Sequence, residues 1–511
     1  MSLEFYNHIK ATAQKTPDHP ALIDAEGALS YSEFLHQIEK FAAALGSLDL
    51  TPTSKLGLLC LNQREYLVAY LGALLKGVPV VPFNFLLGPE DLAFIAQDAE
   101  IDIAVIDSAF VKPEAAPIFQ LFRHKILIGD TDPEITGSGS HKFSEFLHQG
   151  NPEQAKERHT RDPRVPDVLL YTSGTTAKPK GVMLDEEQFA INVDATQSHI
   201  ALNSKDRVIL ALPLFHSFGN IIALLVFRVA GTLILLKQFQ PKSILSAITE
   251  HRATILPLVP TIYSFLVQLY ERGGYDVSTL THCISGGASL PKALLKKVEE
   301  TLGVVVIEGY GLTETAPVIS VNTFKDGSVP GCTGPILSNV EVKIVSEQGD
   351  TMPVGEVGEI LVKGKSVMRG YWKRPNEDKE AFTPDGWLKT GDLGHRDEKN
   401  RLYISAGRKK DLIIRAGENV SPLAIENVLM QHPALAEAAA VGIPDERLGE
   451  KVKACVVLRE GAQAEKSELK KFCIRELPAF MIPDIIEFYD ALPKNATGKI
   501  LKTQLRETHK S

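Results

Sequence analysis

The chain has 511 residues, of which 44% are hydrophobic and 23% charged, and this is the composition of an ordinary globular protein. Its length exceeds one hydrophobic core and predicts two or more domains. The net charge of −8, without a long basic run, disfavours nucleic acid as a partner. Five scattered cysteines without metal-ligand spacing predict reduced thiols rather than a disulfide framework.

The most apolar stretch of the sequence, 221–236, is interrupted by Arg228 and Gly231 and is too short to span a membrane. The first ten residues lack the apolar segment of a signal peptide. We therefore expect a cytoplasmic protein with no transmembrane segment, for which peripheral contact with a membrane stays open.

Strand-like and helical runs alternate through the first 160 residues. Apolar runs at 56–60, 78–82 and 101–106 read as strands, and the segments 65–75 and 90–96 read as helices. Strands that alternate with helices predict βαβ units and a largely parallel, buried sheet. We therefore assign the large N-terminal part to the α/β class.

Residues 171–182 read Tyr-Thr-Ser-Gly-Thr-Thr-Ala-Lys-Pro-Lys-Gly-Val and follow a short apolar strand expected over 167–172. Glycine frees the backbone here, and Pro179 cannot donate a ladder hydrogen bond. The hydroxyl, backbone N–H and ammonium groups suit a polyphosphate, although composition alone fits a polar surface loop equally well. The candidate phosphate contacts are Thr172, Ser173, Gly174, Thr175, Thr176 and Lys180.

Two glycine-rich segments, 284–291 and 308–316, each follow an apolar run. Glycines at a strand end let the backbone approach a flat ligand, and Tyr310 offers a face on which adenine can stack. The Glu314 carboxylate suits Mg²⁺, which usually takes one or two carboxylates together with substrate phosphates. A plain turn and a packed core tyrosine are the alternatives. His216, among aromatic residues, is likewise more often a hydrogen-bonded core residue than a catalyst.

Short alternating runs between 330 and 405 predict an antiparallel region, and a compact α+β unit follows from 423. Asp392 stands in a Thr-Gly-Asp turn, where a carboxylate can accept both hydroxyls of a ribose. Lys499 follows a Thr-Gly turn near the C-terminus, which would expose it on a loop. An ordinary surface lysine is the alternative.

In their order and spacing these segments resemble the motifs of the adenylate-forming superfamily, which includes acyl-CoA synthetases, luciferases and the adenylation domains of peptide synthetases. The resemblance extends over essentially the whole chain. It implies a large N-terminal domain over 1–408 and a small, mobile C-terminal domain over 409–511, with a hinge near Lys410.

The resemblance also implies roles for single residues. Lys499, Glu314 and Thr172 would be catalytic, and Glu314 would bind the metal. The residues expected to bind the nucleotide are Thr172, Ser173, Gly174, Thr175, Thr176, Lys180, Gly286, Gly287, Ala288, Glu308, Gly309, Tyr310, Gly311, Thr313, Asp392, Ile404, Arg408 and Lys499. The acyl pocket is expected at His216, Ser217, Phe218, Gly219, Gly311 and Ala316, and the acceptor tunnel at Gly417.

The activity that the resemblance implies is AMP-forming activation of a carboxylic acid by ATP and Mg²⁺, followed by thioester formation with CoA. The stretch 212–220 lacks the Asp with which amino-acid-activating relatives hold the substrate ammonium. No insertion typical of adenylate-only relatives separates Arg369 from Thr390. The segments around Phe218 and Tyr310 resemble medium- and long-chain fatty acyl members most, so a fatty acid is the substrate we expect.

Several alternatives stay open at this stage. An aryl acid could replace the fatty acid, and the phosphopantetheine of an acyl carrier protein could replace CoA. A luciferase-like oxygenase shares the adenylation half and would emit light in air. A non-catalytic nucleotide or lipid sensor is disfavoured, because Lys499, Glu314 and Asp392 are all present.

Overall fold

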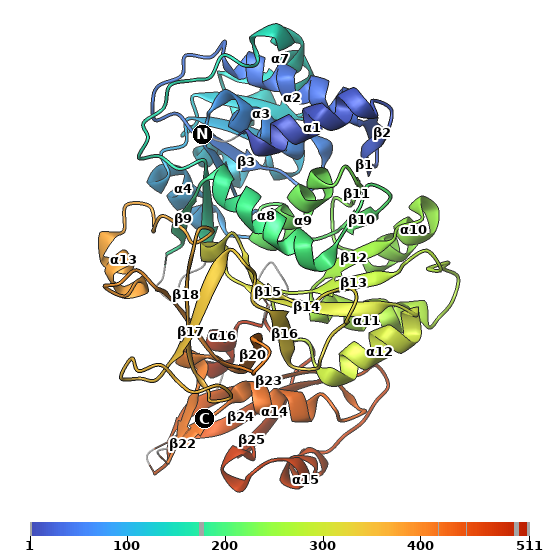
Figure 1. Ribbon diagram of the computed structural model, residues 1–511, viewed down its shortest axis with the longest axis vertical. Helices are drawn as coiled ribbons and strands as arrows, with labels where there is room; N and C mark the ends of the chain where they lie inside the picture. The colour runs from blue at the N-terminus through green and yellow to red at the C-terminus, as the bar shows by residue number, and fades with distance from the viewer. Residues whose placement is uncertain (1–2, 173–177, 417, 446, 495–499, 508–511) are drawn as a thin grey trace.

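The computed structural model describes residues 3–172, 178–416, 418–445, 447–494 and 500–507. Figure 1 shows a large N-terminal part and, below it, a smaller C-terminal part. The strands of the described residues form four sheets, two of them mainly parallel. The α/β prediction for the N-terminal part is therefore confirmed.

The first sheet has the strand order β7-β6-β5-β3-β4-β8-β9. Its strands pair in parallel except at the edge, where β9 runs antiparallel to β8. The predicted early strands are all present, within a few residues of their expected ends. The bounds are β3 Leu56–Leu59, β4 Val80–Pro82, β5 Ile103–Asp107, β6 His124–Ile128, β7 Ser140–Lys142, β8 Val168–Thr172 and β9 Lys180–Leu184.

Strand β9 was not predicted from the sequence. The strand expected over 167–172 is β8, which ends at Thr172, and pairing resumes in β9 with Lys180 opposite Thr172. Pro179 comes immediately before the new strand and so never has to donate a ladder hydrogen bond. The predicted phosphate loop therefore connects two paired antiparallel strands, β8 and β9.

The second sheet has the order β15-β14-β13-β12-β10-β11-β1-β2, with antiparallel pairing only at its two edges. Its inner strands are short and almost entirely buried, as expected for a parallel sheet covered on both faces. The bounds are β1 Pro20–Asp24, β2 Gly27–Ser30, β10 Arg207–Leu210, β11 Thr232–Leu235, β12 Ile255–Leu258, β13 His282–Ser285, β14 Val305–Gly311 and β15 Val318–Val321.

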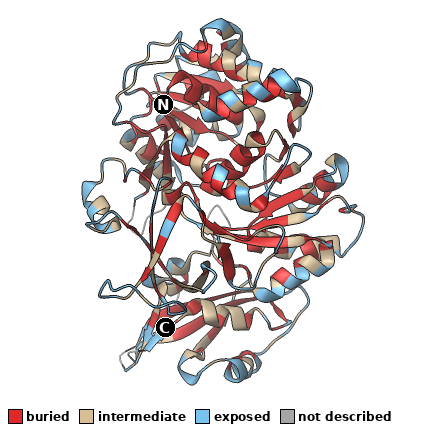
Figure 2. Cartoon of the chain, in the orientation of Figure 1, coloured by how far each residue is buried: buried red, intermediate tan, exposed pale blue. Residues whose placement is uncertain are grey.

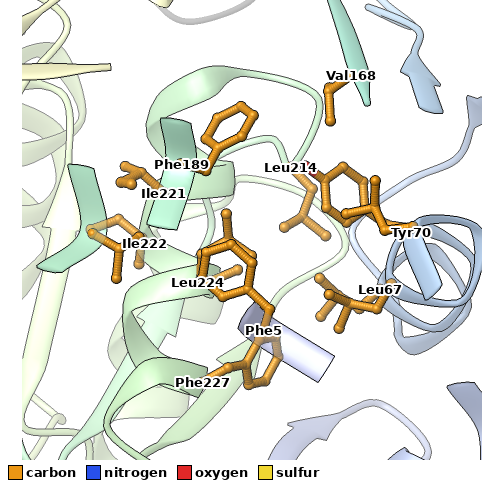
Figure 3. Close-up of a cluster of buried hydrophobic side chains, with 14 of the residues drawn as sticks. Phe5, Leu67, Tyr70, Val168, Phe189, Leu214, Ile221, Ile222, Leu224 and Phe227 are labelled. Carbon is orange, nitrogen blue, oxygen red and sulfur yellow. The ribbon is translucent and has the colours of Figure 1, made fainter. Parts of the chain in front are cut away.

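Helices α8 (Glu186–Ile200) and α9 (Ser217–Arg228) lie between these two sheets (Figure 1). Almost every residue of α9 is buried, and its side chains join α1 (Glu4–Lys15) and α3 (Arg64–Lys76) in one apolar cluster (Figure 3). The apolar stretch 221–236 is thus an interior helix followed by β11. No helix among the described residues is long and apolar enough to cross a membrane.

The third sheet, β16-β20-β19-β18-β17, is antiparallel throughout and confirms the prediction for 330–405. The C-terminal sheet has the order β22-β21-β24-β23, with β25 parallel to β24. The bounds are β16 Cys332–Pro335, β17 Val340–Val345, β18 Gly358–Gly364, β19 Leu388–Arg396, β20 Arg401–Arg408, β21 Ile413–Arg415, β22 Glu418–Val420, β23 Leu435–Asp445, β24 Gly449–Leu458 and β25 Ile485–Phe488.

Burial is highest on the strands and on the helices between the sheets, while the outer helices expose one face (Figure 2). Helix α2 begins at a capping box, in which Ser30 and Glu33 satisfy each other's backbone N–H groups. The bounds of the other long helices are α2 Tyr31–Leu45, α4 Pro89–Asp98, α10 Pro241–His251, α11 Pro260–Tyr270, α12 Lys292–Leu302, α14 Pro422–Leu429 and α15 Lys466–Glu476.

Candidate active site

A cavity of about 1070 Å³ lies where the carboxyl ends of the second sheet's strands face the C-terminal sheet. Ligands of open α/β sheets bind at this edge, because the connecting loops leave a crevice there. Helices α11 and α14 both contribute residues to its lining. The predicted nucleotide-binding residues that line it are Gly287, Ala288, Glu308, Gly309, Tyr310, Gly311, Asp392 and Ile404.

Tyr310 and Asp392 form one wall of this cavity. The Tyr310 hydroxyl donates to Asp392 Oδ2 at 2.7 Å, which joins two predicted nucleotide contacts that are 82 residues apart. Asp392 is buried in β19, and its backbone pairs with Arg408 of β20. The position of the Arg408 side chain lies outside the described part of the structure.

Glu308 gives the cavity a buried carboxyl group. Its side chain is only 6% exposed, and its Oε1 accepts the N–H of Leu290 at 3.0 Å. Because burial disfavours the ionised form, it raises the pKa of Glu308 to about 7. Nearby, Gly287 has a φ of +77°, a left-handed conformation that glycine adopts without steric strain. The loop after β13 can therefore turn along the cavity.

The predicted phosphate loop lies between β8 and β9. Thr172 ends the first strand and pairs with Lys180, which begins the second. The Lys180 Nζ stands 5.4 Å from the centre of the Tyr371 ring, within the range of a cation–π contact. Four further predicted contacts lie outside the described residues: Ser173, Gly174, Thr175 and Thr176.

Glu314 lies in a 3-10 turn, η4 (Thr313–Thr315). Its Oε1 accepts the hydroxyl of Tyr371 at 2.9 Å. Within the described ranges no group of three or more His, Cys, Asp or Glu residues could hold a metal. A single carboxylate near a phosphate loop nevertheless fits Mg²⁺, which completes its octahedral shell with phosphate oxygens and water. This donor set suits a metal that arrives with a polyphosphate.

His216 caps the N-terminus of α9, where its Nδ1 accepts the Phe218 N–H at 3.2 Å. Ser217 Oγ lies 3.2 Å from Thr313 Oγ1, so this helix start touches the turn that carries Glu314. The Phe218 ring lies close to Gly286, where a Cβ would come within 3.2 Å of it. Two further acyl-pocket predictions are fully or nearly buried: Gly219 and Ala316. Of the residues predicted for the acyl pocket, Gly311 alone is among the described residues that line the large cavity.

The C-terminal sheet closes the cavity with the segment that follows β25. Lys494 and Ile500 both line it and pair with each other as an isolated bridge. The Lys494 Nζ also lies 2.6 Å from a Glu437 carboxylate oxygen. Lys499 is outside the described residues, but both described ends of its segment face the same space as Tyr310.

The predicted hinge, Lys410, is exposed in a short 3-10 turn, η5 (Lys409–Asp411), between the last strand of the third sheet and the first strand of the fourth. The domain boundary there stays a prediction. Gly417, predicted at the acceptor tunnel, is not among the described residues.

Sequence reasoning did not single out Tyr371, although this residue contacts both Lys180 and Glu314. It follows Glu314 by 57 residues, so no local spacing connects the two. A tyrosine after a glycine carries no signal of its own, and only the folded chain reveals the contact.

Two family models match the chain, one for AMP-binding enzymes over residues 9–372 and one for the AMP-binding enzyme C-terminal domain over residues 424–499. The first match extends over more than half of the sequence. The chain belongs to the AMP-binding enzyme family. The predicted resemblance to adenylate-forming enzymes is thereby confirmed.

This AMP-binding enzyme is 33% identical to a long-chain-fatty-acid–CoA ligase of Bacillus subtilis (strain 168), over 97% of the chain and 93% of that protein. It is 32% identical to a sulfoacetate–CoA ligase of Cupriavidus necator, over 97% of the chain and 96% of the relative. Its fold matches the crystal structure of ATP-bound MatB from Rhodopseudomonas palustris, with a TM-score of 0.90 and 30% identity over 100% of this chain and 99% of the other.

Proposed function

We propose that this AMP-binding enzyme is an AMP-forming acid–thiol ligase that activates a carboxylic acid with ATP and transfers the acyl group to CoA. The observation that carries the proposal is the shared cavity, in which the hydrogen-bonded Tyr310 and Asp392 face the segment bounded by Lys494 and Ile500. Similarity to two CoA ligases over nearly the full length of each chain supports it.

In the first step a carboxylate oxygen of the acid attacks the α-phosphorus of ATP. The new O–P bond forms as the bond to pyrophosphate breaks, which gives an acyl-adenylate. Tyr310 would stack on the adenine, and Asp392 would accept the ribose hydroxyls. Lys180 and Lys499 would offset the negative charge that develops on the phosphates, as preorganised cations do in phosphoryl-transfer sites.

Glu314 would hold Mg²⁺, which supplies charge neutralisation and orientation of the phosphate oxygens when it is bound. The carboxylate itself needs only to keep one oxygen directed toward the phosphates. Its Oε1 accepts a hydrogen bond from the Tyr371 hydroxyl.

In the second step the thiol sulfur of the acceptor attacks the acyl carbonyl carbon. The C–S bond forms, the C–O bond to AMP breaks, and the thiol proton passes to solvent. Rotation of the C-terminal domain about Lys410 would withdraw Lys499 and bring the loop at Gly417 to the acceptor. Such domain movements separate successive half-reactions in many enzymes.

For the acid we propose a medium- or long-chain fatty acid. The apolar helix α9, with Phe218 beside Gly286, supports an apolar acyl group, and one relative is a long-chain-fatty-acid–CoA ligase. The relative named for sulfoacetate makes a short polar acid the principal competitor. An aryl acid, and a carrier protein in place of CoA, are tested in the same experiment.

The test is pyrophosphate release with Mg-ATP across acids from acetate to palmitate, with sulfoacetate and benzoate added, each measured without an acceptor, with CoA and with holo-acyl carrier protein. A chain-length optimum that CoA accelerates is the expected result. An optimum with sulfoacetate or benzoate would show that the substrate is that acid and not a fatty acid. Acceleration by holo-acyl carrier protein alone would show that the carrier protein, and not CoA, is the acceptor. No release with any acid would overturn the proposed ligase.

A further inference from the structure

Residues 368–374 tie the phosphate hairpin to the turn that carries Glu314. The Met368 N–H donates to the Glu314 carbonyl at 2.8 Å, and the Trp372 N–H donates to the Gly181 carbonyl at 2.7 Å. The segment therefore connects, by backbone hydrogen bonds, two parts of the candidate site that lie far apart in sequence.

Tyr371 lies in the middle of this segment and contacts a charged group on each side. Its hydroxyl donates to Glu314 Oε1 at 2.9 Å, while its ring centre stands 5.4 Å from Lys180 Nζ. Its own backbone N–H donates to Asp378 Oδ1 at 2.7 Å, which anchors the tyrosine to helix α13 (Pro375–Ala381).

We propose that Tyr371 is a positioning residue that orients Glu314 toward the metal and Lys180 toward the phosphates at the same time. The inference rests on the proposed function and adds to it a group that touches neither nucleotide nor acid.

The physical reason lies in the freedom of the two side chains. Glutamate and lysine each have several rotatable bonds, and ordering them when a ligand binds lowers its affinity. A hydrogen bond to one carboxylate oxygen leaves the other oxygen oriented for the metal. Outer-shell partners of this kind commonly change metal affinity or activity by 10- to 100-fold. The ring contributes a cation–π contact that restricts the lysine.

The first experiment measures the dissociation constant of ATP by calorimetry, once with MgCl₂ and once with EDTA, in the absence of any acid. Their ratio is the gain in ATP affinity due to the metal. Tyr371→Phe removes the hydroxyl and keeps the ring, so we expect this gain to fall about tenfold. The constant measured in EDTA should stay within twofold of the wild-type value.

A double-mutant cycle with Glu314→Gln shows whether the hydroxyl acts through Glu314. The effects of the two substitutions on the metal-dependent gain in ATP affinity should be non-additive, because either substitution alone already removes the interaction between the hydroxyl and Glu314. Tyr371→Leu also deletes the ring, and we expect it to weaken ATP binding in EDTA as well, by a few fold, through Lys180.

Tyr6→Phe is the matched control, since the Tyr6 hydroxyl donates to Glu39 Oε1 at 2.8 Å between helices α1 and α2. This variant loses a tyrosine–glutamate hydrogen bond of similar length, and both dissociation constants should stay at their wild-type values.

Equal loss of affinity in MgCl₂ and EDTA for Tyr371→Phe would overturn the proposal, because it indicates general damage to the site. So would additivity with Glu314→Gln, or an unchanged metal gain. If Tyr371→Phe is too unstable to bind ATP in EDTA, the measurements on Tyr371→Leu and on Glu314→Gln alone decide whether the proposal holds. If Glu314→Gln keeps the full metal gain, the positioning role is wrong. Pyrophosphate release by the wild-type protein tests the proposed ligase activity, so a failure of that proposal can be told apart from a failure of the positioning role.

Discussion

The two ends of the candidate site are built differently. At the base end, Glu308, Tyr310 and Asp392 stand on strands of two sheets, and both carboxyl groups are only 6% exposed. At the phosphate end, Lys180 begins an edge strand and Glu314 lies in a 3-10 turn. The base end is held within the strands of two sheets, whereas the phosphate end joins an edge strand to a 3-10 turn through residues 368–374.

This difference matches what each end would bind in the proposed reaction. The nucleoside is the same in ATP, in an acyl-adenylate and in AMP, so a rigid wall serves every stage. The phosphates change in number and charge during the proposed reaction. The groups that would meet the phosphates therefore stand on two separate elements, which residues 368–374 connect.

The largest expected effect comes from Lys499→Ala at the phosphate end. We expect adenylate formation to fall by about 100-fold or more, as for the loss of one charge-stabilising donor. Conversion of supplied acyl-adenylate to thioester should continue, because that step does not need this cation. Both half-reactions are measured separately, with the substitution of an exposed lysine that pairs with Glu300, Lys296→Ala, as control. Equal loss of adenylate formation and of thioester formation would contradict the role proposed for Lys499.

The next effect concerns stability and the buried Glu308. Its native pKa of about 7 lies above the ordinary 4.5, so between these values the native state keeps a proton that the unfolded chain has released. Native stability therefore falls as the pH rises from 4.5 to 7, by about 3 kcal/mol in total, and then levels off. Glu308→Gln carries no such charge and should gain in Tm relative to the wild type between pH 5 and pH 8.

A second buried glutamate supplies the comparison for that experiment. Burial also raises the pKa of Glu186, to about 8, but this side chain accepts the Phe5 N–H at 3.2 Å, away from the cavity. The gain in Tm of Glu186→Gln over the wild type should depend on pH in a similar way, and its KM for ATP should stay unchanged. A difference in Tm between Glu308→Gln and the wild type that does not change between pH 5 and pH 8 would contradict the raised pKa of Glu308.

Asp392→Ala tests the rigid base end directly. We expect the KM for ATP to rise by about 10- to 100-fold, the range for hydrogen bonds to a charged group. The wild type should discriminate against 2′-deoxy-ATP, and the variant should discriminate less, because the acceptor for the ribose hydroxyl is gone. Unchanged discrimination would place the ribose elsewhere, and a kcat that falls without a change in KM would contradict a binding role.

The smallest expected effect is that of Gly287→Ala. The glycine has a φ of +77°, and a Cβ there would meet only Val259 at an ordinary 3.5 Å, so the cost is backbone strain of about 1–2 kcal/mol. Gly303→Ala is matched, with a φ of +66° and no atom within 4 Å. Both should lower stability alike, and only the first should raise the KM for ATP, by a few fold.

Local patterns in the sequence were sufficient for much of this protein. The alternation of apolar runs predicts the parallel sheets, because buried strands need continuous apolar faces. Glycine-rich turns after such runs predict the base end around Gly287 and Tyr310, since a ligand can approach only where the backbone is bare. The short alternating runs between 330 and 405 likewise predict the antiparallel region. One local element was not predicted, namely β9, which begins directly after Pro179.

The tertiary structure decided which of these groups meet. Tyr310 and Asp392 are 82 residues apart and come together across two sheets. The packing of α9 made His216 a helix cap, and only pairing of residues 368–374 beside β9 brought Tyr371 between Lys180 and Glu314. The physical reason is the range of the signals: propensity and periodicity act over a few residues, whereas a contact between distant side chains depends on how whole elements pack.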